Sequence, residues 1–336
     1  MVSVIIPTLN RSDQLSKTLQ SLVAQNSLAD AEIIVVDNGS TDGTKSIVEQ
    51  YSKQISCLNY AYNAMPGLLT GRHLGIALAK GDILSFLDDD VELNPAYIQN
   101  IVTLFSKNAD VHFATGPNLP KYETIPPQWL ESFWEKTSEG TFCSWLSLLD
   151  FGSTEKFIDQ GFVWGLNFCC RKATAIELGG FHPDCIDTKL QKFQGDGETG
   201  LTNKAREKGY AALYSPGLKL YHIVPAGRLT ASYFERRAFY QGVCNSFTEL
   251  RKNKGTLSTN NGIIQKLKPC LKNYYRKLKL KLQVSSHQTQ LQLLLLKLER
   301  QQKEGYLFHQ RKFKKEEKVR NWVLKDNFWD FNLPQS

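Results

Sequence analysis

The chain has 336 residues, of which 41% are hydrophobic and 22% are charged. Such a chain is too apolar to be disordered, and it is long enough for one large α/β domain with a smaller addition. No stretch reaches the roughly 20 uninterrupted apolar residues that a membrane-spanning helix needs. Residues 1–14 lack the basic and small-residue regions of a signal peptide, so we expect a cytoplasmic protein. The seven cysteines include no CxxC pair, which predicts reduced thiols and neither a zinc site nor a disulfide framework.

The net charge of +8 is unevenly distributed along the chain. Residues 262–336 contain 17 Lys and Arg against 6 Asp and Glu, whereas residues 1–261 contain 24 against 27. Because the net positive charge is confined to the C-terminal part, we do not expect nucleic acid as a partner. There, Leu267, Leu271 and Tyr274 alternate with Lys268 and Lys272 in the pattern of a basic amphipathic helix. Such a helix fits peripheral attachment to the anionic inner face of a membrane, or packing on its own domain or on a second subunit as a homodimer.

Short β-branched runs alternate with amphipathic segments through the first 90 residues. Strands are expected over 2–8, 32–36, 58–63 and 83–87, and helices over 13–24, 44–51 and 68–79. Further along, a helix over 201–209 precedes a strand-like segment over 211–222, and another helix is expected over 231–252. This order predicts an α/β fold with a mostly parallel sheet flanked by helices. We expect this domain to occupy residues 1–255, and a basic helical C-terminal extension, helical over 263–307, to occupy residues 263–336.

Polar residues follow three of the expected strands, namely Pro7–Thr8, Asp37 and Asp88–Asp90. Ligands of parallel sheets gather at the carboxyl ends of strands, so this convergence indicates a binding site. Three adjacent carboxylates repel one another, and a hard divalent cation that joins them to a diphosphate would relieve the repulsion. The alternative is a solvated acidic turn. Asp37 could accept from a base N–H or a ribose hydroxyl, or form a local turn. A GxGxxG motif is missing after the first strand, which argues against NAD or FAD.

Several motifs together resemble the family 2 glycosyltransferases, which have the GT-A fold. They are VSVIIPTLNRSDQLSKTLQSL, EIIVVDNGSTDGT, GLLTGRHLGIALAKGDILSFLDDDVELNP, GGFHP, GDGETGL, KGY and YSPGLKLYH, in this order over about residues 1–250. The resemblance implies metal-dependent, inverting transfer of a sugar from a nucleotide diphosphate donor, usually a UDP-sugar, to a hydroxyl of a glycan or lipid-linked acceptor. It implies Mn²⁺ or Mg²⁺ as cofactor. Processive members carry membrane helices and a Gln-x-x-Arg-Trp motif, which this sequence lacks, so single-sugar transfer is expected.

The resemblance also assigns residues to the site. Those implied to bind the nucleotide sugar are Pro7, Thr8, Asn10, Arg11, Asp37, Gly67, Arg72, Asp88 and Asp89. Those implied to bind metal are Asp88, Asp90 and His222, although a lone histidine is more often a packed residue. Arg228 fits either phosphate pairing or a structural salt bridge. His73 stands where the family often has Asn.

The catalytic base has two candidates. An inverting reaction needs a carboxylate on the sugar face opposite the leaving group, so the base must be separate from the Asp88–Asp90 cluster. Counting back from Lys208-Gly209-Tyr210 selects Glu198, which stands where the family usually has Asp, and Asp196 is the competing candidate. The alternative for both is capping of the following helix, which fits Asp196 better.

Two other functions stay open from the sequence alone. A nucleotidyltransferase also combines an α/β sheet with carboxylates and metal, but it would need a Gly-rich basic loop where this chain has PTLNRSDQ. A non-catalytic nucleotide-sugar-binding protein would not need to keep Asp90 and Glu198.

Overall fold

The computed structural model describes residues 1–65, 67–257 and 286–330. In these residues the strands are β1 (Val2–Thr8), β2 (Ala31–Asp37), β3 (Leu58–Tyr62), β4 (Ile83–Leu87), β5 (Val91–Leu93), β6 (Val111–Thr115), β7 (Asn118–Tyr122), β8 (Glu135–Lys136), β9 (Thr141–Cys143), β10 (Leu148–Asp150), β11 (Lys156–Ile158), β12 (Asn167–Arg171), β13 (Ala211–Tyr214) and β14 (Leu220–Val224). The α-helices are α1 (Ser12–Val23), α2 (Thr44–Ser52), α3 (Leu68–Leu78), α4 (Tyr97–Lys107), α5 (Lys172–Glu177), α6 (Glu198–Glu207), α7 (Ala231–Lys252), α10 (Ser286–Lys315) and α11 (Glu317–Val323).

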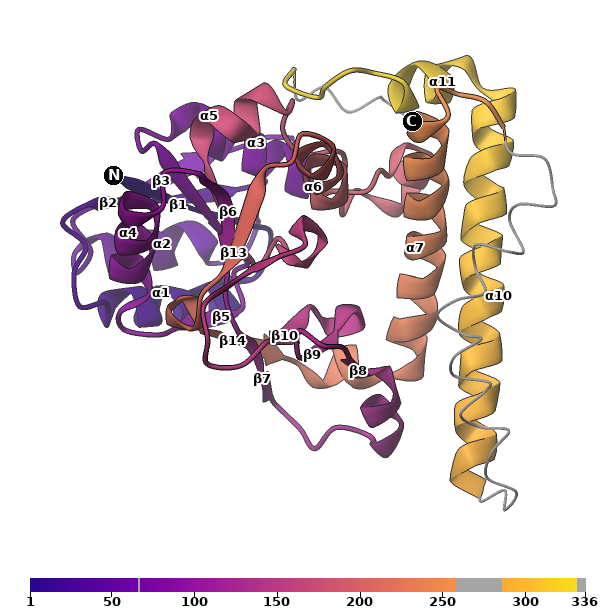
Figure 1. Ribbon diagram of the computed structural model, residues 1–336, viewed down its shortest axis with the longest axis horizontal. Helices are drawn as coiled ribbons and strands as arrows, with labels where there is room; N and C mark the ends of the chain where they lie inside the picture. The colour runs from indigo at the N-terminus through magenta and orange to yellow at the C-terminus, as the bar shows by residue number, and fades with distance from the viewer. Residues whose placement is uncertain (66, 258–285, 331–336) are drawn as a thin grey trace.

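The larger sheet has the strand order β11-β13-β6-β12-β4-β1-β2-β3 within the described residues. One half of it is parallel: β1 pairs with both β2 and β4, and β2 pairs with β3. Every residue of β1 and β2 is buried, as expected for continuous β-branched runs in a sheet covered on both faces. Helices flank the sheet (Figure 1). The expected α/β class with a mostly parallel sheet is therefore confirmed.

A second, smaller sheet has the order β5-β14-β7-β10-β9-β8 among the described strands. It corrects one expectation: the segment 211–222 is two strands, because the turn Pro216–Leu218 interrupts it. β13 joins the larger sheet beside β6, and β14 joins the smaller one beside β7 and β5. The pairing of β14 with β5 sets His222 opposite Val91 and so brings it beside Asp90.

The C-terminal helices pack on the rest of the protein. Figure 1 shows α10 lying along α7, and the two helices approach closely at Gly242 and Gly305. A Cβ atom at Gly242 would lie 2.0 Å from the carbonyl oxygen of Gln302, and one at Gly305 would lie 2.0 Å from that of Phe239. The two helices can therefore lie this close only because glycine, which has no side chain, occupies both positions.

Leucines of α10 and apolar residues of α11 belong to the hydrophobic core. Leu291, Leu294, Leu295 and Leu298 of α10 are buried against the smaller sheet and α7. Trp322 of α11 is buried with residues of the larger sheet. Of the alternatives for the extension, residues 286–330 pack on their own chain; the basic segment with Lys268 and Lys272 lies outside the described residues. None of the described helices combines the length and apolar character needed to cross a bilayer.

Candidate active site

The polar residues expected at strand ends do converge. Thr8 and Asp37 are paired across β1 and β2, and Asp88–Asp90 follow the neighbouring strand β4. The Thr8 hydroxyl donates a hydrogen bond to Asp89 Oδ2 at 2.7 Å, which ties the end of β1 to the acidic cluster. The parallel register of three neighbouring strands thus assembles the candidate site at one edge of the sheet.

Two arginines hold the acidic cluster. Arg11 contacts Asp89 Oδ1 at 3.2 Å and Asp90 Oδ2 at 2.6 Å, and Arg228 contacts Asp90 Oδ2 at 2.9 Å. Burial alone would raise the pKa of Asp90, but the groups around it, the guanidinium groups of Arg228 and Arg11 among them, outweigh burial and hold it well below the usual value. Burial raises the pKa of Asp89 to about 7 despite Arg11, and burial together with Asp90 raises that of Asp88. Asp90 is therefore the carboxyl group of the cluster whose charged form its surroundings favour.

His222 lies beside Asp90 and is buried. Its Nδ1 donates to the carbonyl oxygen of Leu146 at 2.9 Å, so the ring presents the lone pair of Nε2. That lone pair accepts a hydrogen bond from Arg228 Nη1 at 2.7 Å. Nε2 also lies 3.6 Å from Asp90 Oδ1, an oxygen that is buried without a hydrogen-bond partner. Arg228 consequently bridges two of the three residues expected to bind metal.

The carboxylate oxygens of Asp88 and Asp90 and the imidazole nitrogen of His222 are atom types that bind divalent cations. Their present arrangement does not form a complete coordination site. Among the residues that the structure describes, no group of three or more His, Cys, Asp or Glu side chains is arranged to hold a metal ion. Two donor atoms do lie near each other: Asp90 Oδ1, which has no hydrogen-bond partner, is 3.6 Å from Nε2 of His222. Neighbouring ligands of an octahedral ion lie about 3 Å apart, so a small shift would bring these two atoms to that spacing. Asp88, the third expected ligand, lies close enough to Asp90 for the charge of Asp90 to contribute to its raised pKa.

The side expected to face the nucleoside is organised around Asp37. Its Oδ2 accepts from the Tyr60 hydroxyl at 2.8 Å, and its Oδ1 accepts from the backbone N–H of Ser40 at 2.7 Å. The second bond is the local turn that the sequence offered as the alternative. Asn10 supports the same turn, because its Oδ1 accepts from the N–H of Thr41 at 2.7 Å.

Two further residues of the expected nucleotide-binding set, Pro7 and Gly67, contribute to the site through the conformation of their backbone. Pro7 is buried in β1, where it is paired with Val36. Gly67 precedes α3 with a φ of +132°, a conformation that side chains rarely adopt. Gly67 therefore allows α3 to begin where it does, which positions Arg72.

Arg72, which is buried, forms an ion pair across the site with Glu198, which is partly exposed. Arg72 Nη1 lies 3.3 Å from Glu198 Oε2, and its guanidinium lies 4.8 Å above the ring of Phe181. The backbone N–H of Gly165 donates to Glu198 Oε1 at 3.2 Å, and a Cβ atom at position 165 would lie 2.0 Å from Arg72 Nη2. Burial would lower the pKa of Arg72, but Glu198, Asp88 and Asp184 outweigh burial and raise it. Arg72 thus links Glu198 electrostatically to the acidic cluster.

The structure separates the two candidate bases. The Glu198 side chain is 25% exposed, whereas that of Asp196 is 3% exposed. Asp196 accepts hydrogen bonds from His182 Nδ1 at 2.6 Å and from the Thr248 hydroxyl at 2.5 Å. The expected helix cap is wrong for Asp196: the residue before α6 is Gly197, and no side chain caps the helix. The reason is that His182 and Thr248 draw the carboxylate into the core.

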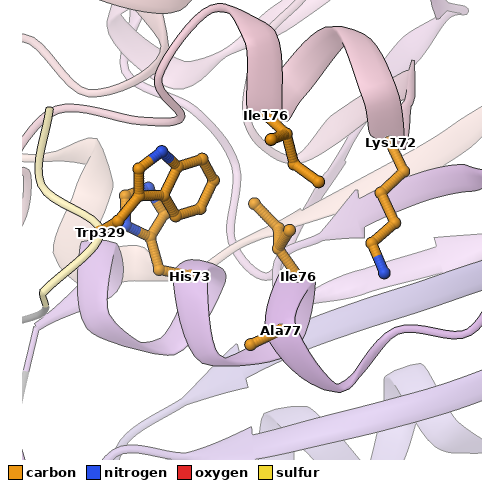
Figure 2. A pocket seen from close by; sticks show the side chains of 6 residues that line it. All are labelled: His73, Ile76, Ala77, Lys172, Ile176 and Trp329. Carbon is orange, nitrogen blue, oxygen red and sulfur yellow. The ribbon is translucent and has the colours of Figure 1, made fainter.

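His73 connects the site helix α3 to the C-terminal end. Its Nε2 accepts from the N–H of Phe181 at 2.9 Å, its Nδ1 donates to the carbonyl of Phe328 at 3.1 Å, and its ring stacks on Trp329. Figure 2 shows this stack at the edge of a hollow of about 390 Å³ that α5 also lines. A second hollow, of about 430 Å³, includes Asp196, and neither hollow is lined by Asp88–Asp90. The candidate site is therefore identified by the contacts among its side chains and not by either of these two hollows.

Three residues near the site were not found from the sequence. Asp184 directly follows the GGFHP motif, and burial and Glu198 raise its pKa. Arg237 lies on α7, and its electrostatic partners include Asp184. Tyr60 holds Asp37 from β3. Only Asp184 had a signal in the sequence, namely its place next to that motif.

The comparisons with known proteins agree with the motifs. The sequence model described as glycosyl transferase family 2 matches residues 3–171, half of the chain. Validoxylamine A glucosyltransferase from Streptomyces hygroscopicus is 28% identical over 204 residues, which cover 55% of this chain and 47% of that protein. The GalNAc(5)-diNAcBac-PP-undecaprenol beta-1,3-glucosyltransferase of Campylobacter jejuni is 39% identical over 94 residues, which cover 27% of this chain and 30% of that protein. The matches thus span less than half the length of these relatives.

Solved structures show the same fold. A mannosyltransferase from Pyrobaculum calidifontis, in complex with GDP-Man and Mn²⁺, matches 98% of this chain and 84% of its own with a TM-score of 0.55 and 18% identity. S. aureus TarS 1-349, in complex with UDP-GlcNAc, matches 93% of this chain and 91% of its own with a TM-score of 0.51 and 17% identity. The family resemblance and the GT-A fold expected from the motifs are confirmed.

Proposed function

The chain belongs to glycosyl transferase family 2, and we propose that it transfers single sugars, with inversion, from a nucleotide diphosphate sugar to a hydroxyl of a glycan or lipid-linked acceptor. A UDP-sugar is the donor that we would test first. The names of the similar glucosyltransferases support sugar transfer, and the TarS complex with UDP-GlcNAc supports the donor class. The family leaves the nucleotidyltransferase alternative without support.

One observation carries the proposal: the acidic cluster and the candidate base lie on different elements with Arg72 between them. Asp88–Asp90 follow β4, and Glu198 begins α6. Arg72 pairs with Glu198 directly and interacts electrostatically with Asp88. A leaving diphosphate and an acceptor hydroxyl could thus bind on opposite sides of the sugar, which inversion requires.

Arginine side chains supply positive charge where a diphosphate would leave. Arg11 and Arg228 both contact Asp90, and the side chain of Arg228 is 22% exposed. Breaking the anomeric bond builds negative charge on the diphosphate, and fixed cations nearby stabilise that charge. Asp90, Asp88 and His222 would hold Mn²⁺ or Mg²⁺. When bound, such an ion supplies further positive charge beside the same phosphates.

Glu198 is the residue that we propose as general base. Its carboxylate is held by Arg72 Nη1 and by the N–H of Gly165, and it remains partly exposed. In that place it can accept the proton of the acceptor hydroxyl as the oxygen attacks the anomeric carbon. Asp196 does not suit this role, because its two oxygens already accept hydrogen bonds from His182 and Thr248.

A donor-binding screen tests the proposal. The protein would be melted with UDP-Glc, UDP-GlcNAc and GDP-Man, each with Mn²⁺ and with EDTA in its place. At least one nucleotide sugar should raise the melting temperature in Mn²⁺, and Asp90→Asn should reduce that shift. A matched control is Asp110→Asn, which changes an exposed carboxylate beside β6 and should leave the shift intact. If no nucleotide sugar or nucleoside diphosphate shifts the melting temperature, the proposed function is wrong.

A further inference from the structure

The Nε2 atom of His222 has one lone pair, and Arg228 occupies it. The Leu146 carbonyl can only accept, so Nδ1 carries the ring proton. The guanidinium can only donate, so the 2.7 Å contact uses the Nε2 lone pair. A metal ion would coordinate through the same lone pair. The Arg228 hydrogen bond and metal coordination at Nε2 are therefore mutually exclusive.

Arg228 also neutralises Asp90, the other well-placed ligand. Its Nη2 lies 2.9 Å from Asp90 Oδ2 while its Nη1 contacts His222, so one guanidinium spans both residues. The side chains of Asp90 and His222 are 1% and 3% exposed. A charge buried to that degree needs a partner, and Arg228 and Arg11 are the ones present.

The turn that carries Arg228 lies at the surface. Arg228 lies in the turn Ala226–Leu229 between β14 and α7. Ala226 and Gly227 are exposed, and a Cβ atom added at Gly227 would meet nothing within 4 Å. Arg228 can thus leave Asp90 and His222 without repacking the core. A diphosphate, with its several charged oxygens, is a strong competing partner for a guanidinium.

We propose that Arg228 is an internal counter-ion that competes with the divalent cation for Asp90 and His222, so that the site accepts metal well only when a nucleoside diphosphate draws Arg228 away. This inference rests on the proposed function. It predicts that metal and nucleotide bind with positive coupling, and that each raises the affinity for the other by the same factor. Arg228 then has two successive sets of partners, first Asp90 and His222 and then the donor phosphates.

Arg11 does not have this role. It contacts Asp89 and Asp90 but has no contact with His222. Arg11 can stay in place while Nε2 becomes free, and it would continue to compensate the cluster. The competition is consequently specific to Arg228, the arginine on the exposed turn.

The test is Mn²⁺ binding to the full-length protein, measured by electron paramagnetic resonance with and without UDP. Without UDP, Arg228→Ala should bind Mn²⁺ at least tenfold more tightly than the wild type. Adding UDP should tighten Mn²⁺ binding in the wild type at least tenfold, and in Arg228→Ala much less. Arg236→Gln removes an exposed arginine of α7 that lies over Tyr233, and it should behave like the wild type.

Arg228→Lys distinguishes competition for the ligand atoms of Asp90 and His222 from a general effect of the positive charge at position 228. Lysine keeps the charge but lacks the planar fork that contacts Asp90 and His222 together. Its Mn²⁺ affinity without UDP should therefore approach that of Arg228→Ala. If Arg228→Lys matches the wild type, or if UDP leaves wild-type Mn²⁺ affinity unchanged, the inference is wrong while the donor proposal stands. If no variant binds Mn²⁺ even with UDP, the metal requirement and this inference fail together, and UDP binding by itself then decides the donor proposal.

Discussion

Replacing Asp196 by Asn should weaken the fold and spare the chemistry. Asp196 is almost fully buried and accepts from His182 at 2.6 Å and from Thr248 at 2.5 Å. A hydrogen bond to a charged group contributes about 1.5–3 kcal/mol. Asn keeps one acceptor oxygen and loses the charge, so we expect the free energy of unfolding to fall by about 2–3 kcal/mol. Donor affinity and turnover should stay within a few-fold of the wild type.

Glu198→Gln should instead remove the chemistry. Gln keeps an acceptor for Arg72 but removes the charge that compensates this buried guanidinium, so we also expect the free energy of unfolding to fall, by about 1–3 kcal/mol. Turnover should fall by roughly 10²–10⁴, the usual contribution of a positioned base. Donor affinity should be kept, because the nucleotide is expected on the other side of Arg72.

Three measurements on both variants decide between these residues: urea unfolding, calorimetric titration with UDP, and release of nucleotide from the donor. The two variants control for each other, since they lie two residues apart and each removes one negative charge. Loss of turnover in Asp196→Asn with unchanged stability, together with an active Glu198→Gln, would refute the assignment. The base would then be Asp196, and its buried contacts would be part of the catalytic machinery.

Three other outcomes are expected. Asp90→Asn should weaken Mn²⁺-dependent UDP binding tenfold or more, about 1.4 kcal/mol, and an unchanged calorimetric titration would contradict its role. Burial lowers the pKa of His73 to about 3 and that of His309 to about 4, whereas the unfolded imidazoles take up protons near 6.5. The unfolded state binds more protons at these two imidazoles below that pH, so together they should lower the free energy of unfolding by about 4 kcal/mol by pH 5. Asp89, whose pKa is raised to about 7, takes up a proton in the folded state over the same range and should offset part of this loss. Urea unfolding should therefore show a smaller net loss, and a stability that rises towards pH 5 would oppose this. Ending the chain at Gly262 should leave little soluble protein, because α10 and α11 contribute to the core; a stable fragment would mean that the extension is separable.

The parts of the fold that the sequence predicted are those with strong local patterns. The strands expected over 2–8 and 32–36 are β1 and β2, and the helix expected over 68–79 is α3 within one residue. β12 was not predicted, although it lies antiparallel in the middle of the larger sheet. Its sequence, NFCCR, has no alternation of apolar and polar residues, because the strand is buried almost throughout. Such a short run carries little information without its neighbours.

The candidate site shows the same division. Thr8, Asp37 and Asp88–Asp90 were predicted to converge because parallel strands end at one edge of a sheet. The partners of Asp196 were not predictable, since His182 lies in a loop and Thr248 lies 52 residues away on α7. His73 likewise contacts Phe328, 255 positions later in the chain. Long-range packing decides these contacts, and no local pattern encodes it.

The extension is the clearest case of a pattern with more than one physical solution. Its leucines and basic residues fit a membrane surface, a second subunit or the protein's own core. For residues 286–330 the core is the partner, since Leu294, Leu298 and Phe313 are buried in it. Lys297 and Arg300 of the same helix are exposed, so α10 keeps one face for solvent. Membrane attachment stays a prediction for the basic segment before α10.

The proposed transfer reaction can be tested most directly by the release of nucleoside diphosphate from a nucleotide sugar that the binding screen identifies. Wild-type protein with Mn²⁺ should release the nucleotide and the sugar in equal amounts. Proton NMR of the first-formed sugar should show the anomeric configuration opposite to that of the donor. Glu198→Gln should bind the same donor yet release nucleotide at least 10²-fold more slowly. A tightly bound donor that wild-type protein never cleaves, or a product with retained configuration, would contradict an inverting glycosyltransferase with Glu198 as its base.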